Sequence, residues 1–252
     1  MEQGLFNLAS LGFKKKKMEE ALDYKYVLLR NADAVTRTEF VKNTYKHLAG
    51  AVLAFILVET ILLSMPWATA LAQALVSSGT SWLLVLGGFM FITNYAEKMA
   101  RKSHDRSKQY QGLALYVVAE AIIFLPLIMM AISAGGGTAL IQQAGLITLA
   151  LFGGLSLVVL KTGKDFSFLK TALTVGGFVA MGLILAGAIF GFNLGLAFSG
   201  GMVVLAAGSI LYQTSNMVHK YSTDQHVAAA LGLFASVMLL FWYILSILMS
   251  RD

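Results

Sequence analysis

Long runs of apolar residues, separated by short polar connections, fill the chain from about residue 46 onward. An α-helix needs about 20 predominantly apolar residues to cross the roughly 30 Å hydrocarbon core of a bilayer. Seven runs reach that length, and we expect membrane spans at 46–65, 76–96, 112–133, 138–160, 169–190, 195–213 and 228–249. The pattern therefore predicts an all-α, polytopic membrane protein with seven transmembrane helices.

The composition favours a membrane protein over a soluble globular one. Hydrophobic residues make up 58% of the 252-residue chain and charged residues only 13%, against about 25% charged in an average globular domain. A soluble fold of this size cannot bury so much apolar surface, whereas a lipid bilayer solvates it. The formal net charge of +6 falls in short blocks between the apolar runs. We interpret these blocks as a topological signal and expect no nucleic-acid partner.

The basic residues gather on one side of the predicted bundle. Nine lie before or at the start of the first span, five in 97–111, three in 161–170 and one in 214–227. The connections expected on the other side, 66–75, 134–137 and 191–194, carry none. Eighteen of the 19 basic residues thus share one side, which the positive-inside rule places in the cytoplasm. We therefore expect a cytoplasmic N-terminus and a C-terminus outside.

Residues 1–45 form a basic N-terminal segment, predicted to be cytoplasmic, ahead of a transmembrane domain at 46–252. Apolar residues between positions 5 and 13 could form a short interfacial helix, with Lys14 to Lys17 on lipid phosphates. Alternatively, the segment is a partly disordered tail, because runs of charge are usually solvated. The sequence leaves both interpretations open.

Two ionisable side chains, Glu59 and Glu120, lie well inside the predicted spans. A carboxylate in hydrocarbon is costly, so it normally faces a cavity or a partner. Glu120 lies near mid-span, and Pro126 can kink the same helix and turn backbone carbonyls toward a polar interior. Both glutamates are candidate cation or proton sites. The structural alternative is a protonated glutamic acid that is hydrogen-bonded between helices.

The sequence offers no recognisable catalytic, metal or cofactor site. It has no cysteine, and His47, His104, His219 and His226 do not have the spacing of a metal site. Ser199 has no histidine at the same predicted membrane depth, so a serine nucleophile would lack its base. We therefore expect a protein that is not an enzyme and that needs no cofactor or metal.

Three stretches carry a resemblance to a known family. Residues 208–219, with the sequence GSILYQTSNMVH, lead into 224–248. The other two stretches are Asn43-Thr44-Tyr45 before the first span and the loop Lys164-Asp165-Phe166-Ser167-Phe168. Together they resemble the transmembrane Bax inhibitor motif family, in particular its bacterial YccA-like branch, over about residues 40–252.

The resemblance implies a seven-helix fold in which a central last helix is ringed by six others, in the bacterial inner (plasma) membrane. It implies no classical catalysis. Members of the family are associated with a calcium or other cation leak and with stress and death suppression. The YccA-like branch is associated with binding and restraining the FtsH membrane protease.

The family's pH-sensing aspartate pair aligns with Gln213 and Ser236, and neither side chain can ionise. Calcium leak gated by that pair is therefore not expected here, although Gln213 and Ser236 could hydrogen-bond and hold the last two helices together. If the chain conducts ions, Glu120 or Glu59 must supply the negative charge. We expect a membrane stress regulator that acts on a partner such as FtsH, with a cation leak channel as the alternative.

Overall fold

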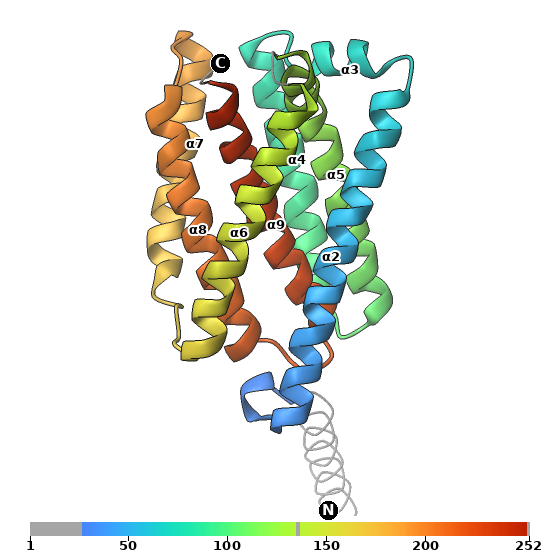
Figure 1. Ribbon diagram of the computed structural model, residues 1–252, viewed down its shortest axis with the longest axis vertical. Helices are drawn as coiled ribbons and strands as arrows, with labels where there is room; N and C mark the ends of the chain where they lie inside the picture. Colours follow the sequence, from blue (N-terminus) through green and yellow to red (C-terminus); the bar gives the residue numbers. More distant parts are fainter. Residues whose placement is uncertain (1–26, 135–136, 251–252) are drawn as a thin grey trace, which may run out of the picture.

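The computed structural model describes residues 27–134 and 137–250 (Figure 1). Within these residues the chain is helical, and the only extended pairing is a single bridge between Leu28 and Ser222. The elements are η1 (Leu29–Asn31), α2 (Ala34–Ser64), α3 (Ala68–Leu75), α4 (Gly79–Arg101), α5 (Arg106–Ser133), α6 (Thr138–Thr162), α7 (Leu169–Phe190), α8 (Gly195–His219) and α9 (His226–Met249).

The predicted membrane spans correspond to these helices. Six of the described helices are long and apolar enough to cross a bilayer, and the pair α3–α4 gives a seventh span if it is counted as one broken span. The helices of that pair meet at an angle of 100°, and α3 lies across the end of the bundle (Figure 1). The break is stabilised by Ser78, whose hydroxyl caps α4 by accepting the backbone N–H of Ser81.

Helix α2 begins twelve residues before the predicted first span. Asp33 provides its N-cap, because its carboxylate accepts the backbone N–H of Thr36 at 2.9 Å. With 31 residues, α2 is about 46 Å long, which exceeds the thickness of the hydrocarbon core, so its first turns extend beyond that core. These turns include residue 45, where the basic N-terminal segment was expected to end. The predicted interfacial helix and Lys14 to Lys17 lie outside the described residues.

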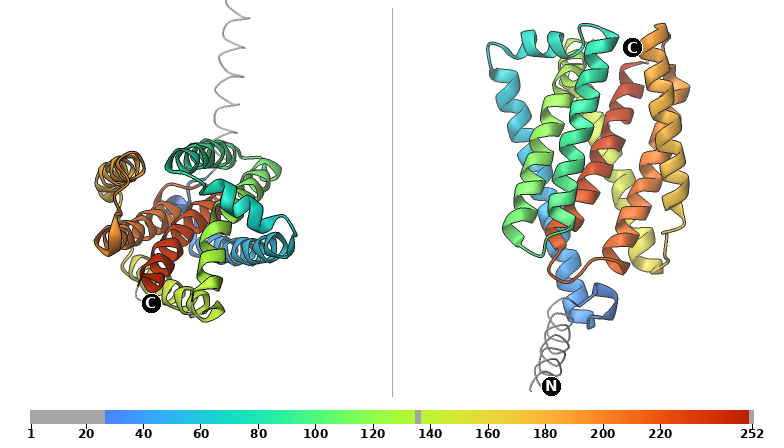
Figure 2. Two further views of the ribbon diagram at one scale, coloured as in Figure 1. Left: turned by 90° about the horizontal axis from the view of Figure 1, so that it is seen from above. Right: turned by 180° about the vertical axis from the view of Figure 1, so that it is seen from behind.

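The helices alternate in direction, so their ends form two layers (Figures 1 and 2). We call the layer where α2, α5, α7 and α9 begin the basic end, because it carries Lys98, Arg101, Lys161 and Lys220. The opposite layer, which contains α3 and the end of α9, is called the far end. The basic residues that the structure describes therefore gather at one end, as the sequence predicts.

Helix α9 is the centre of the bundle, as the resemblance implies. It contacts α2, α4, α5, α6 and α8, and Leu231, Leu233 and Phe234 are fully buried in it. Helix α7 is not part of the expected ring around α9. No Cα atom of α7 lies within 8 Å of a Cα atom of α9, and α7 packs instead on α8 and α4. Figure 2 shows α7 at the periphery.

Small residues and aromatic rings determine how closely the helices approach. A Cβ atom at Gly112 of α5 would lie 2.6 Å from the carbonyl oxygen of Ala96 of α4, so glycine permits this close contact. Further toward the far end, Phe124 of α5 packs edge-on against Phe55 of α2 and Trp242 of α9. These contacts fix the rotation of the helices that carry Glu59 and Glu120.

Candidate functional site

A cavity of about 630 Å³ lies between α4, α5, α7, α8 and α9. Its lining contains the polar residues Glu97, Glu120, Ser209, Gln213 and Ser236. Three of these, Glu120, Gln213 and Ser236, are residues that the sequence analysis singled out, so the fold brings them to one space. The volume lies within the range of about 300–1,000 Å³ that is typical of ligand pockets.

Gln213 does not pair with Ser236. Its Oε1 atom accepts a hydrogen bond from Nη2 of Arg101 at 3.0 Å, and the same guanidinium forms an ion pair with Glu97 at 2.9 Å. Arg101 therefore bonds to a side chain on each of two helices. A neutral amide thus links α8 to a cation on α4.

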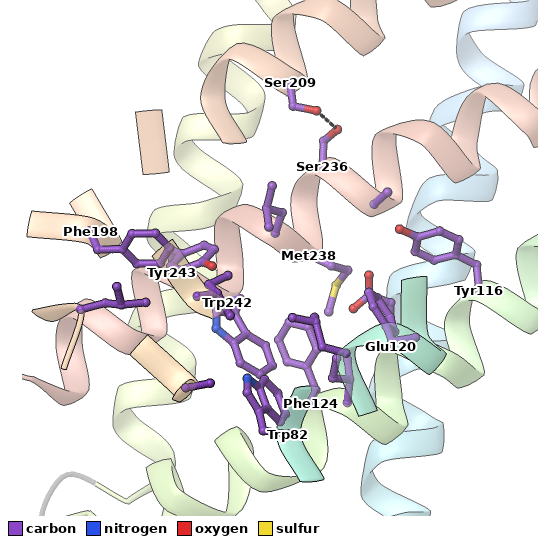
Figure 3. A pocket seen from close by; sticks show the side chains of 18 of the residues that line it. Trp82, Tyr116, Glu120, Phe124, Phe198, Ser209, Ser236, Met238, Trp242 and Tyr243 are labelled. Atoms are coloured by element: carbon purple, nitrogen blue, oxygen red, sulfur yellow. Dashed lines mark hydrogen bonds between the residues drawn. The ribbon is translucent and has the colours of Figure 1, made fainter. Parts of the chain in front are cut away.

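Ser236 pairs with Ser209 of α8. Their hydroxyl oxygens are 2.8 Å apart, and the Ser236 hydroxyl also donates to the carbonyl oxygen of Gly232 at 3.1 Å. Figure 3 shows this pair in the wall of the cavity. The hydrogen bond between Ser209 and Ser236 therefore joins α8 to α9, in place of the direct Gln213–Ser236 bond that the sequence suggested.

Glu120 points into the cavity from the middle of α5 (Figure 3). It is only 5% exposed, and its neighbours in the close-up are Tyr116, Phe124 and Met238. A carboxyl group placed between an aromatic wall and a small polar wall can bind a cation or hold a proton.

Glu59 lies elsewhere. It extends the buried face of α2, and neither carboxyl oxygen has a hydrogen-bond partner among the described residues. Glu59 follows Phe55 by four residues and Glu120 precedes Phe124 by four, while the two rings are in contact. Since α2 and α5 run in the same direction, the two glutamates differ by about 12 Å in depth, so they do not form a carboxylate pair.

The loop motif that begins at Lys164 docks on α8. The Ser215 hydroxyl donates to Asp165 at 3.1 Å and accepts the backbone N–H of Phe166 at 2.9 Å. The backbone N–H of Ser167 donates to the same Asp165 oxygen, and these donors, the Ser167 backbone first, hold the pKa of Asp165 below its ordinary value. Phe168 contacts Phe166 and is 71% exposed at the basic end.

The loops at the basic end are tied together by side chains that sequence reasoning did not single out. Gln225 donates to the carbonyl oxygen of Arg101 at 3.0 Å, and Gln109 donates to that of Asp224 at 3.2 Å. His104 pairs with Asp224 at 2.9 Å. These residues are more than 110 positions apart in the α4–α5 and α8–α9 connections, so no local pattern could have found them.

Two histidines meet where α2, α5 and α9 come together. The rings of His47 and His226 are 4.9 Å apart between centroids, and the second nitrogen of His47 bonds to the Tyr110 hydroxyl at 2.7 Å. In the described part of the chain, no group of three or more His, Cys, Asp or Glu side chains could hold a metal ion.

Comparisons with known proteins show which family this chain is similar to. The family model described as inhibitor of apoptosis-promoting Bax1 matches residues 37–252. The modulator of FtsH protease YccA from Escherichia coli K12 is 30% identical over 219 residues, which cover 84% of this chain and 91% of that protein.

Two further relatives align over shorter regions. An uncharacterized protein of Pseudomonas aeruginosa is 37% identical over 123 residues, which cover 48% of this chain and 55% of that protein. The Golgi anti-apoptotic protein of vaccinia virus is 27% identical over 113 residues, which cover 43% of this chain and 46% of that protein. Because the family model extends over most of the chain, from the first turns of α2 to the C-terminus, this multi-pass membrane protein belongs to the Bax inhibitor family.

Proposed function

We propose that this chain is a regulatory protein of the bacterial inner membrane that binds an FtsH-like membrane protease and modulates it. The observation that carries the proposal is the 30% identity to the Escherichia coli modulator of FtsH protease over most of both chains. The replacement of the family's acidic pair by Gln213 and Ser236 also favours a role in which ion conduction gated by that pair is not required.

The proposed orientation places the basic end in the cytoplasm. Eighteen of the 19 basic residues belong to segments expected there, and such residues are retained on the cytoplasmic side during insertion. The N-terminal segment and the loop with Asp165 would then face the cytoplasm together. A partner with a cytoplasmic domain could reach both.

Helix α7 and the loop before it are the surface that we propose for the partner. Ala180 is the only buried residue of α7, while Phe178 and Ile189 are 76% and 69% exposed. A peripheral helix can contact another transmembrane helix without disturbing the core around α9. At the basic end, exposed Phe168 between Lys164 and Lys170 would extend the same surface out of the membrane.

Reconstitution of the full chain with an FtsH-type protease tests the proposal. We expect the full chain to co-purify with the protease and to change its rate of degrading a membrane substrate. Phe178→Ala with Phe168→Ser should weaken both effects. As a matched control, Phe91→Ala changes an equally exposed phenylalanine on α4 and should change neither effect. Absence of co-purification and an unchanged degradation rate with the full chain would exclude the proposal.

A cation leak is the second candidate function, favoured by the position of Glu120 beside Gln213 and Ser236 in one cavity. Conduction would require the Arg101–Gln213 bond at the basic end of this cavity to open. In liposomes that contain the protein, we would expect Glu120→Gln to abolish calcium or proton flux. Glu59→Gln makes the same change outside this cavity and should preserve the flux. Absent flux, or equal flux in both variants, would remove this candidate.

A further inference from the structure

A close contact between helices narrows each end of the cavity that contains Glu120. At the basic end, Arg101 and Gln213 meet over Gly232, where a Cβ atom would lie 3.0 Å from the Gln213 oxygen. At the far end, α4 starts against α7: a Cβ atom at Gly79 would lie 2.6 Å from the carbonyl oxygen of Ala188. These two contacts narrow the access to the cavity from either aqueous phase.

The side of the cavity that faces the bilayer is less complete. Helices α4 and α8 both line the cavity, yet no Cα atom of one lies within 8 Å of the other among the described residues. Between them lies α9, whose Ala235 and Leu239 line the cavity and are partly exposed although most residues around them are buried. Helix α7 packs on both α4 and α8 and meets α4 where Gly79 contacts Ala188. A lateral route between α4 and α8 therefore lies on the basic side of that contact.

The lining changes character along the cavity. Toward the far end it is aromatic, with Trp82 stacked on Trp242 at 6.1 Å and Phe198 edge-on to Tyr243 (Figure 3). Further toward the basic end it carries the Ser209–Ser236 pair, Glu120 and Gln213. The lining residues Gly79 and Glu97 are 18 positions apart on α4, so the cavity extends along about 27 Å of this helix.

The charge of the polar part limits the kind of ligand. Glu97 is neutralised by its ion pair with Arg101, which leaves Glu120 as the ionisable group that faces the space. Among the described residues that line this space, an anionic group would meet no unpaired cation, and the nearby Arg101 is bonded to both Glu97 and Gln213. A hydroxyl or amine could instead hydrogen-bond with Glu120 and the serine pair.

We propose that this cavity binds a single long-chain amphiphile from the bilayer, with its alkyl chain along the aromatic wall that contains Phe124, Phe198 and Trp242 and an uncharged or cationic polar end at Glu120, Ser209 and Ser236. The ligand enters laterally between α4 and α8. The proposal does not depend on a protease partner, because it rests only on the shape and chemistry of the cavity.

Tryptophan quenching in nanodiscs tests this site in the full chain. Trp67→Phe with Trp82→Phe leaves Trp242 in the cavity wall, whereas Trp82→Phe with Trp242→Phe leaves Trp67, which is 49% exposed near the far end. Dibromostearoyl glycerol should quench Trp242 in a saturable manner at a low mole fraction, and Trp67 only in proportion to its mole fraction. Dibromostearic acid, ionised at alkaline pH, should give a weaker saturable component. Strictly proportional quenching of both tryptophans would overturn the proposal.

A cavity-filling variant shows whether the saturable component comes from this site. In the chain that keeps Trp242, Ala235→Phe should abolish saturable quenching, while Val204→Phe, at a position that is 72% exposed on α8, should retain it. If Ala235→Phe does not fold, unbrominated monostearoyl glycerol is added as a competitor of the brominated lipid to the chain that keeps Trp242. Recovery of Trp242 fluorescence at a saturating concentration supports the site, and no recovery contradicts it.

Discussion

Arg101 of α4 donates a hydrogen bond to Gln213 of α8 at 3.0 Å, although the Cα atoms of the two helices nowhere come within 8 Å. The long arginine side chain thus bridges two helices that the backbone keeps apart. Its ion pair with Glu97, four residues earlier on α4, holds the guanidinium in place. This bridge narrows the basic end of the cavity through a contact between an amide and an arginine.

Removing the Gln213 amide should loosen this bridge. A hydrogen bond to a charged group contributes about 1.5–3 kcal/mol to stability, and Arg101 keeps its ion pair with Glu97, so we expect Gln213→Ala to cost the lower part of that range. The measurement is thermal unfolding of the purified protein in detergent. Gln143→Ala, at an exposed position of α6, is the matched control and should leave the melting temperature unchanged. An equal effect of both substitutions would contradict a bridging role.

Two glycine substitutions should have opposite effects on stability. Gly112→Ala places a Cβ atom 2.6 Å from the Ala96 carbonyl oxygen, so α4 and α5 must separate, and overpacking of this kind costs about 1–3 kcal/mol. Gly88→Ala adds a methyl group with no atom within 4 Å, and it should gain roughly 0.5–1 kcal/mol, because alanine loses less backbone entropy. Thermal unfolding of both variants checks the prediction. A stabilising Gly112→Ala would show that the helices are not in this close contact.

The docking of the loop at Asp165 should depend on acid pH. The folded chain holds the pKa of Asp165 below its ordinary value. Its stabilising effect is therefore fully present above the ordinary carboxyl pKa and is lost as the pH falls through the lowered value. We expect cleavage of the full chain at Lys164 to stay slow at neutral pH and to accelerate only in strong acid, measured by limited proteolysis with proteases matched to each pH.

Ser215→Ala tests the origin of this effect. The substitution removes one donor to Asp165 and the acceptor of the Phe166 N–H, so the acid transition should move to higher pH. Cleavage at neutral pH should also become faster. Ser246→Ala removes a hydroxyl that bonds only within α9, to the carbonyl oxygen of Trp242, and it should change neither property. If the acid transition did not move in Ser215→Ala, the serine would not be the docking contact.

Glu59 should be dispensable for stability. Both of its oxygens are buried without a hydrogen-bond partner in the described part of the chain, and a buried polar group in that state is destabilising. Glu59→Leu should therefore leave the melting temperature unchanged or raise it. A large fall in the melting temperature would indicate that the carboxyl has a partner in the membrane-embedded protein, such as bound water.

Membrane orientation can be checked with fusions to alkaline phosphatase, which is active only outside the cytoplasm. A fusion at Gly163, in the basic end, should be inactive. A fusion at the C-terminus should be active, because seven spans separate it from a cytoplasmic N-terminus. Activities in the opposite order would overturn the proposed orientation, and inactivity of both would contradict the number of spans.

The sequence by itself determined where the chain can span a membrane and that the basic residues gather at one end. In lipid, each helix must expose apolar side chains and satisfy its backbone N–H and C=O groups with hydrogen bonds inside the same helix. The signal for a span is therefore local and can be read from one segment at a time. It also carried the family resemblance, since the motifs at 164–168 and 208–219 are continuous stretches. The first residue of α2 and the 100° break before α4 do not follow from the apolar pattern, because the polar caps Asp33 and Ser78 set them.

Only the tertiary structure decided which polar side chains meet. The sequence made both Glu59 and Glu120 candidate cation or proton sites, yet of these two it is Glu120 that lines the cavity. Gln213 bonds to Arg101, 112 positions away, rather than to Ser236. Such pairings depend on the rotation and depth of several helices at once. Those quantities are set by contacts such as Gly112 on Ala96 and Phe55 on Phe124, which no single segment specifies.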